Sequence, residues 1–116
     1  MLSLPSAANV YLCVRPADLR KGFDGLSALV ELVFRRNVLD GHLFLFINKR
    51  RDRVKALWWD KDGLAIWYKR LERGCFELPR DGQEQPHVML DATALAMLLG
   101  GVPLATPRRL RYKRPA

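Results

Sequence analysis

The sequence predicts an α+β fold: a single domain in which an antiparallel β-meander of three to five strands packs against one long helix, with a short C-terminal helix. Its 116 residues fit one domain of ordinary size. Apolar residues recur at three- and four-residue steps between positions 19 and 34, which is the period of a helix. After residue 41, apolar runs alternate with short charged turns, as in a meander. We expect residues 1–102 to form the domain and residues 103–116 a basic, flexible C-terminal tail.

The first two elements are a strand over residues 9–14 and the long helix. Asp18 is placed to cap this helix, whose apolar stripe consists of Leu19, Phe23, Leu26, Leu29, Val30, Val33 and Phe34. Gly22 and Gly25 interrupt the pattern, and each costs about 1 kcal/mol of helix propensity relative to alanine. Either they allow close packing against the sheet, or the RKGFDG segment is a loop that presents Arg20 and Lys21 before the helix starts.

The meander follows from three runs of strand-forming residues. Residues 43–47 are apolar without alternation, as in a central strand buried on both faces. Residues 53–59 and 64–71 should pair antiparallel across a four-residue turn at 60–63, so that Lys55 faces Tyr68 and Arg53 lies beside Arg70. The opposite face, with Trp58 and Trp67, is the more apolar and should pack on the long helix.

The C-terminal third is less regular. The segment CFEL at residues 75–78 is a candidate edge strand, and residues 87–90 are a candidate last strand. Asp91 should cap a short helix over residues 92–99, which Gly100 and Gly101 close.

Composition restricts the class of partner. The net charge is +8 and the sequence pI is about 10.1, values typical of proteins that bind polyanions such as nucleic acid. Cys13 and Cys75 have apolar neighbours and are expected to be buried free thiols, which fits a cytoplasmic protein. The histidines and cysteines show no metal-ligand spacing and no apolar run is long enough for a membrane span, so we expect neither a metal or other cofactor nor a membrane partner.

The basic excess is concentrated in the meander, since residues 41–80 hold ten basic and five acidic side chains. A cationic sheet with an exposed aromatic side chain is typical of proteins that bind nucleic-acid strands. The candidate phosphate contacts in this region are Lys49, Arg50, Arg51, Arg53, Lys55, Lys69, Arg70 and Arg73. The same charges have a second explanation, because charged residues also keep exposed strands soluble.

The C-terminal tail is a second candidate for DNA contact. Its prolines favour an extended chain, and it contains no acidic residue among Arg108, Arg109, Arg111, Lys113 and Arg114. Arms of this kind follow phosphates or lie in a minor groove. Basic termini also occur without a defined partner.

No catalytic motif is present in the sequence. The carboxylates available for metal-assisted phosphoryl transfer are Asp24, Asp60, Asp62 and Glu72, and their spacing matches no known constellation. There is no phosphate-binding glycine motif, nucleophile elbow or HExxH. The sequence therefore indicates a binding protein and not an enzyme.

Three segments, RKGFDGL at residues 20–26, GHLFLFINKRRDRVKALWWDKDG at 41–63 and WYKRLERGCFELP at 67–79, resemble a known family. They are similar, in order and spacing, to the TnpB (second open reading frame) accessory proteins of insertion-sequence-66-type transposable elements. This family is distinct from the much larger RNA-guided nuclease of the same name. The motif positions are Arg20, Lys21, Gly22, Phe23, Asp24, Gly25, Lys55, Trp59, Asp60, Gly63, Lys69, Arg70, Leu71, Glu72, Gly74 and Phe76.

The resemblance implies a part in transposition beside a separate DDE-type transposase, and it supplies no catalytic residues. The resulting hypothesis is a non-catalytic DNA-binding accessory factor. The alternative is a protein adaptor that binds the transposase without touching DNA, with Trp58, Trp59 and Trp67 as anchor.

Overall fold

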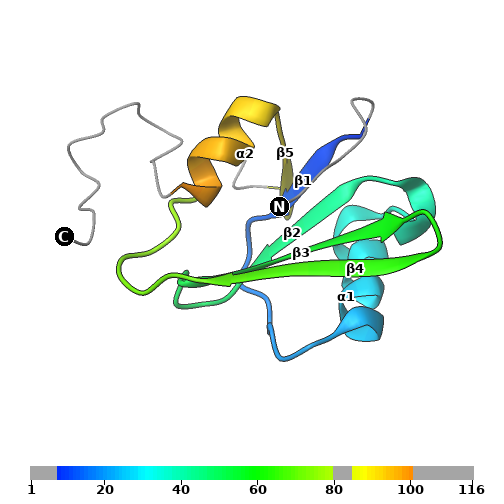
Figure 1. The fold of residues 1–116 in the computed structure, drawn as a ribbon, viewed down its shortest axis with the longest axis horizontal. Coiled ribbons are helices and arrows are strands. Elements are labelled where there is room, and N and C mark those ends of the chain that lie inside the picture. The colour runs from blue at the N-terminus through cyan, green and yellow to red at the C-terminus, as the bar shows by residue number, and fades with distance from the viewer. Residues whose placement is uncertain (1–7, 80–84, 101–116) are drawn as a thin grey trace.

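The computed structural model describes residues 8–79 and 85–100. One five-stranded sheet separates two helical layers, with α1 (Phe23–Leu29) on one face and α2 (Ala92–Leu99) on the other (Figure 1). The strands are β1 (Val10–Cys13), β2 (Leu43–Ile47), β3 (Arg53–Asp60), β4 (Gly63–Arg70) and β5 (His87–Leu90). The α+β class is confirmed. No helix in this part of the chain is long and apolar enough to cross a membrane.

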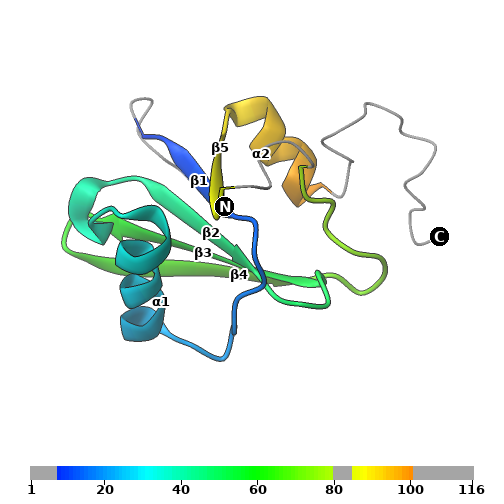
Figure 2. The same ribbon diagram turned by 180° about the vertical axis from the view of Figure 1, so that it is seen from behind.

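The sheet is mixed, and the prediction of an antiparallel meander is wrong for the whole sheet. The strand order is β4-β3-β2-β1-β5, and the β2–β3–β4 part is the expected antiparallel meander. The first strand, β1, pairs parallel to β2, with Val10 opposite Leu43, and β5 is antiparallel to β1 at the outer edge. A parallel pair needs a crossover connection, and the segment containing α1 provides it (Figure 2).

The first helix starts later than predicted. Asp18 does not cap it, because its carboxylate accepts the Arg20 N–H only two residues on and forms a local turn. The first helical bond runs from the Leu26 N–H to the Gly22 carbonyl, so the segment before Phe23 is a loop. The helix continues as a π-helical segment, η1 (Val30–Phe34), and ends at Arg35 in a left-handed conformation. The prediction of one long helix is therefore wrong, and the loop alternative for Arg20 and Lys21 is correct.

The face of the sheet under α1 carries an aromatic core. Leu26, Val30 and Phe34 are at most 3% exposed and pack on Phe44 and Phe46 of β2. The ring centroids of Phe34 and Phe44 are 5.1 Å apart. Leu57 and Ile66 of the meander also pack here, so α1 covers the face that also bears Lys55 and Tyr68, opposite to the face predicted.

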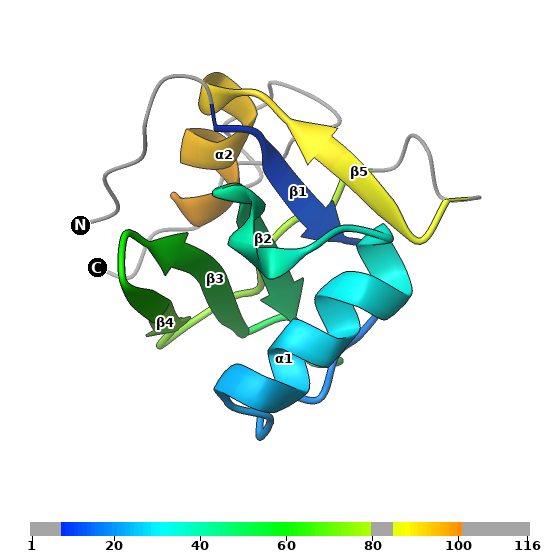
Figure 3. The same ribbon diagram turned by 90° about the vertical axis from the view of Figure 1, so that its right-hand side faces the viewer.

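The other face packs on α2 and on the segment after β4 (Figure 3). Asp91 caps α2 as predicted, because its Oδ1 accepts the Ala94 N–H at 2.7 Å. Trp58 and Trp67 are partly buried in this layer. The CFEL segment is no edge strand, since it crosses this face and buries Phe76 to 1% exposure.

Two local predictions fail in detail. Cys13 is buried, but Cys75 is exposed, and both thiols are free. The turn between β3 and β4 has two residues instead of four, because Asp60 pairs directly with Gly63. Lys61 has a φ of 62°, and the Asp62 N–H donates to the Asp60 carbonyl across it at 2.6 Å.

Candidate nucleic-acid interface

Three loops distant in sequence meet at one end of the sheet. Because β1 and β2 are parallel, the loops that follow them, residues 14–22 and 48–52, leave from the same end. The Ala17 N–H donates to the Ile47 carbonyl at 2.9 Å and fixes the first loop against the end of β2, where the second loop begins. We call this the basic end. The exposed basic residues in its three segments (14–22, 48–53 and 70–76) are Arg15, Arg20, Lys21, Lys49, Arg50, Arg51, Arg70 and Arg73, and Arg53 is half-buried.

Asn48 organises the loop that carries the arginines. Its Oδ1 accepts the N–H groups of Asp52 and Arg53 at 3.1 and 3.0 Å, and its Nδ2 donates to the Asp52 carboxylate at 2.7 Å. The last bond lowers the pKa of Asp52. Arg51 has a φ of 61°, a conformation that arginine rarely adopts outside a turn held from both sides. Asn48 therefore holds the backbone of the loop that carries Lys49, Arg50 and Arg51.

We expect Asn48→Ala to lower the free energy of unfolding by about 1–3 kcal/mol, because two partly buried N–H groups lose their acceptor. Asn48→Asp keeps the acceptor but places a second carboxylate beside Asp52. The loss of unfolding free energy in Asn48→Asp should therefore grow as the pH rises above about 4. Denaturant unfolding of both variants across pH 3–8 measures the difference. Equal stability of Asn48→Ala and the wild type would remove Asn48 from this role.

The segment after β4 holds the same loop from the other side. The Leu71 N–H donates to the Asp52 carbonyl at 2.7 Å, and the Phe76 N–H donates to the Arg51 carbonyl at 2.6 Å. The Cys75 thiol donates to the Arg50 carbonyl at 3.4 Å. Gly74, with a φ of 75°, makes the reversal of the chain that these contacts require. Arg73 is thereby held beside this loop (residues 48–52), which we call the arginine loop.

Basic side chains also lie side by side on the sheet itself. The predicted register is confirmed, with Arg53 opposite Arg70 and Lys55 opposite Tyr68. The Lys55 ammonium lies 4.9 Å from the centre of the Tyr68 ring and donates to the Lys21 carbonyl at 2.9 Å. Like charges directly opposite on paired strands repel. Arg70 has only a loose, exposed partner in Glu72 at 3.7 Å, so this end carries uncompensated positive charge.

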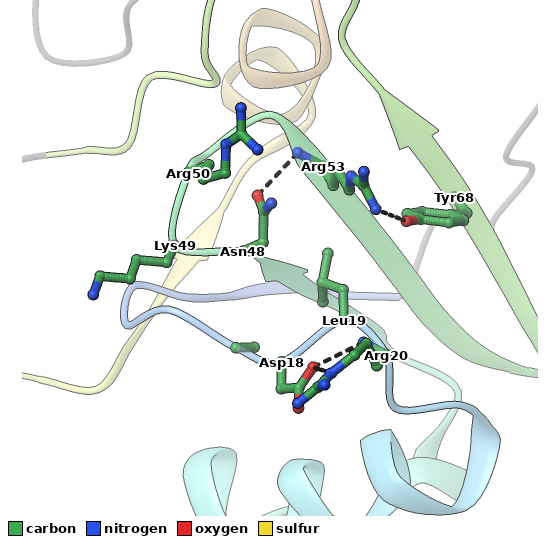
Figure 4. Close-up of a pocket in the computed structure, with 9 residues that line it drawn as sticks. Asp18, Leu19, Arg20, Asn48, Lys49, Arg50, Arg53 and Tyr68 are labelled. Carbon is green, nitrogen blue, oxygen red and sulfur yellow. Dashed lines mark hydrogen bonds and ion pairs between the residues drawn. The ribbon is translucent and has the colours of Figure 1, made fainter.

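A pocket of about 460 Å³ opens between the first two loops and the sheet. Figure 4 shows Asp18 and Arg20 on one side, Lys49 and Arg50 on the other, and Arg53 with Tyr68 at the sheet. The Arg53 guanidinium donates to the Tyr68 hydroxyl at 3.4 Å. Of the residues that line the pocket, Asp18 alone is acidic, and it is paired with Arg20 at 2.9 Å.

The Asp18–Arg20 pair predicts a low titration midpoint. Hydrogen bonds from the Arg20 side chain and backbone lower the pKa of Asp18 to about 2. A lowered pKa in the folded protein favours the ionised form, so the pair should persist from neutral pH down to about 2 and be lost below it. NMR titration of the Asp18 carboxyl should give this midpoint, and Arg20→Gln should return it toward 3.8. A midpoint near 3.8 in the wild type would contradict the pairing.

Other predicted site residues lie elsewhere. Lys69 points to the opposite face, where its ammonium donates to the Leu99 carbonyl at the end of α2 at 3.2 Å. Trp59, Asp60 and Gly63 lie at the far end of the meander. The tail residues Arg108, Arg109, Arg111, Lys113 and Arg114 fall outside the described residues.

Gly22 and Gly25 of the RKGFDG segment lie where the first loop joins α1. An added Cβ at Gly25 would lie 2.9 Å from the Lys21 Cβ, so glycine leaves room for the Lys21 side chain across the first turn of α1. Gly22 precedes the helix, while Phe23 is 49% exposed and Asp24 is exposed in the first turn. This loop presents the Lys21 carbonyl to Lys55.

The four candidate catalytic carboxylates do not converge. Asp62 lies in the two-residue β3–β4 turn and Asp60 just before it, Glu72 lies beyond the other end of β4, and Asp24 is in the first turn of α1. Among residues 8–79 and 85–100, no three His, Cys, Asp or Glu side chains form a group that could hold a metal ion.

Asn48 and the Asp18 turn were not identified from the sequence as the residues that organise the loops of the basic end. Arg15 was also not included among the candidate phosphate contacts. An Asx residue just after a strand and just before a charged turn was the available signal for Asn48. Nothing in the sequence places the loop that contains Arg15 at the same end of the sheet as residues 48–52, because this follows from the parallel pairing of β1 with β2.

Comparison with known proteins identifies the family. The family described as IS66 Orf2 like protein matches residues 8–109. The chain is 34% identical over 107 residues to uncharacterized protein y4hO of Sinorhizobium fredii (strain NBRC 101917 / NGR234), covering 90% of this chain and 91% of that protein. It is 29% identical over 117 residues to uncharacterized protein y4jC of the same organism, covering 99% and 97%. No solved structure matches the chain. Because the family match covers residues 8–109 of the 116, the chain belongs to the IS66 Orf2-like family.

Proposed function

We propose that the protein is a non-catalytic DNA-binding factor of insertion-sequence transposition, and that it contacts DNA phosphates through the basic end. The family supports a role in transposition, and action beside a separate transposase is part of the proposal. The observation that carries the proposal is the meeting of three basic loops at one end of the sheet. Among the described residues, the basic end has ion pairs only at Arg20 and Arg70.

This concentration of charge has a physical cost that an anion would offset. Arg53 and Arg70 repel each other, and the arginine loop is held with one residue at positive φ, two backbone hydrogen bonds from the segment after β4 and the Cys75 thiol contact. Charges placed only for solubility do not need such rigid support. Phosphates of a DNA backbone supply counter-charge at a spacing that several arginines can contact together.

The test is fluorescence anisotropy of the full chain with duplex from the element ends, scrambled duplex and single strand, each over a salt series. We expect binding with a steep salt slope, since each neutralised phosphate contributes about 0.9 to the slope on duplex DNA. Preference for the end sequence would add specific recognition to phosphate contact. Absence of binding to every DNA at low salt would overturn the proposal.

The second candidate is an adaptor that binds the transposase without contacting DNA. One observation weakens its predicted anchor, because Trp58 and Trp67 pack in the α2 layer and are partly buried. Co-purification with the transposase that survives nuclease and high salt, together with no direct DNA binding, would favour the adaptor.

A further inference from the structure

We propose that the pocket at the basic end binds one unpaired nucleotide of a DNA strand, with its base stacked on Tyr68 and its phosphate held by Arg53 and the 48–52 loop. This inference rests on the proposed function and adds to it the class of DNA that the pocket selects. It concerns a concave site, whereas phosphate contact in general needs only a charged surface.

The size and lining of the pocket fit a nucleotide. Its volume of about 460 Å³ lies in the range of pockets that enclose small ligands, roughly 300–1,000 Å³. Ala17 and Leu19 form an apolar floor, and Leu19 is only 8% exposed. Basic side chains stand around this floor on two sides, from the Asp18–Arg20 turn and from the 48–53 segment (Figure 4). An apolar floor with a cationic rim suits a planar base joined to a phosphate.

Tyr68 supplies the stacking surface. It lies on the edge strand β4 and is 50% exposed, so part of its ring is open to solvent. Its hydroxyl accepts from Arg53, and Lys55 lies 4.9 Å from the ring centre. These two contacts hold the ring at the pocket wall. Bases stack on such half-exposed rings in proteins that bind single strands.

Charge distinguishes a nucleotide from a neutral ligand. Arg53, Lys49 and Arg50 line the pocket without a carboxylate of the described residues within 4.0 Å. Arg20 is already paired with Asp18 and contributes less net charge. The cations that remain are available to a phosphate beside the ring.

The geometry favours an unpaired nucleotide over a paired one. Inside a duplex both faces of a base are covered by its neighbours, so a protein ring can stack on it only after the base leaves the stack. The interior of a duplex can offer phosphates to the rim of the pocket but no base face to Tyr68, and a blunt duplex exposes a base-pair face only at its two ends. Tyr68 should therefore matter for single strands and much less for duplex.

The experiment compares the binding of a labelled oligothymidine strand and a blunt duplex, by anisotropy, to three variants of the full chain. Tyr68→Leu removes the ring and keeps apolar bulk, while Tyr68→Phe keeps the ring and loses the hydroxyl. Phe23→Leu is the matched control, because Phe23 is 49% exposed and does not line the pocket. Free thymidine monophosphate is added as competitor.

We expect Tyr68→Leu to weaken strand binding by about five- to a hundredfold, the effect of losing one stacked base, and duplex binding by less than about twofold. Tyr68→Phe and Phe23→Leu should stay within about threefold of the wild type. Free thymidine monophosphate should compete weakly, because it has only one phosphate. Competition by the free nucleotide as strong as by the strand would assign the pocket to a free nucleotide and overturn the inference.

A second measurement on the wild-type protein keeps the inference testable if Tyr68→Leu does not fold. A strand containing iodouracil should crosslink to Tyr68 on irradiation, as mapped by mass spectrometry. Crosslinking only at other residues, or equal loss of strand and duplex binding in a folded Tyr68→Leu, would overturn the inference and leave phosphate contact intact. No binding of either DNA at low salt would overturn both proposals.

Discussion

Simultaneous replacement of Arg50, Arg51 and Arg53 by glutamine is expected to weaken duplex binding at least about tenfold at low salt, because charge-assisted contacts to phosphates are lost together. The salt slope should also fall, by up to about 0.9 for each lost phosphate contact. The three residues lie in or beside one loop that Asn48 and the segment after β4 hold by backbone contacts. Glutamine keeps much of the side-chain length, so the backbone contacts should survive. Anisotropy over a salt series measures both quantities.

The chain offers a matched control at the opposite end of the sheet. Arg35, Arg36 and Lys61 are exposed there, and their replacement by glutamine removes the same amount of charge. Arg35 and Lys61 also have positive φ values, as Arg51 does, so the backbone demands are similar. If both triple variants lose affinity equally, the basic end is not the contact surface and net charge alone drives binding.

Phe76→Ala is expected to lower the free energy of unfolding by about 3–5 kcal/mol, since it empties a fully enclosed site in the core. Phe76 is 1% exposed and packs with Val54 and Ala56 beneath the meander. It also positions its own N–H to donate to the Arg51 carbonyl. Denaturant unfolding followed by tryptophan fluorescence gives the change.

The control for Phe76→Ala is Phe23→Ala, the same substitution at a half-exposed ring, which should cost far less. If the folded Phe76→Ala protein binds duplex as well as the wild type does, then the segment after β4 is not needed to hold the arginine loop. Similar losses of stability for the two variants would show that the CFEL segment adds little to the core.

The meander was the most predictable part of the fold. Strand pairing across a short turn has a fixed period of two, so Trp59 opposite Leu64 determines every pair down to Arg53 and Arg70. The sequence could predict this register because every step is local. The turn itself was shorter than predicted, and the register survived because Asp60 and Gly63 pair with each other.

The sheet topology was not predictable in the same way. All residues of β1 and β2 are buried, so neither strand shows an alternation that reveals its neighbours or its direction. For a similar reason, the first helix covers the face of the meander opposite to the one predicted. Both faces of the meander carry apolar residues, and the two tryptophans weighted the prediction towards the face that α2 in fact covers.

The site was predictable in residue type but not in arrangement. The cations of the 49–55 segment are visible in the sequence, as is the partnership of Lys55 with Tyr68. Lys69 and Arg70, adjacent in sequence, point to opposite faces, and only the fold shows that α2 engages Lys69. The proximity of residues 14–22 to residues 48–52 follows from the β1–β2 pairing, which no local pattern encodes.

The two ends of the β3–β4 hairpin give the molecule a definite orientation on a polyanion. If the basic end meets DNA, the strands point away from the duplex axis and the Lys61–Asp62 turn becomes the most distant point of the hairpin. A fluorophore or a fused domain attached at this turn would then report binding without obstructing it. The same turn would face outward for any further protein of a nucleoprotein assembly.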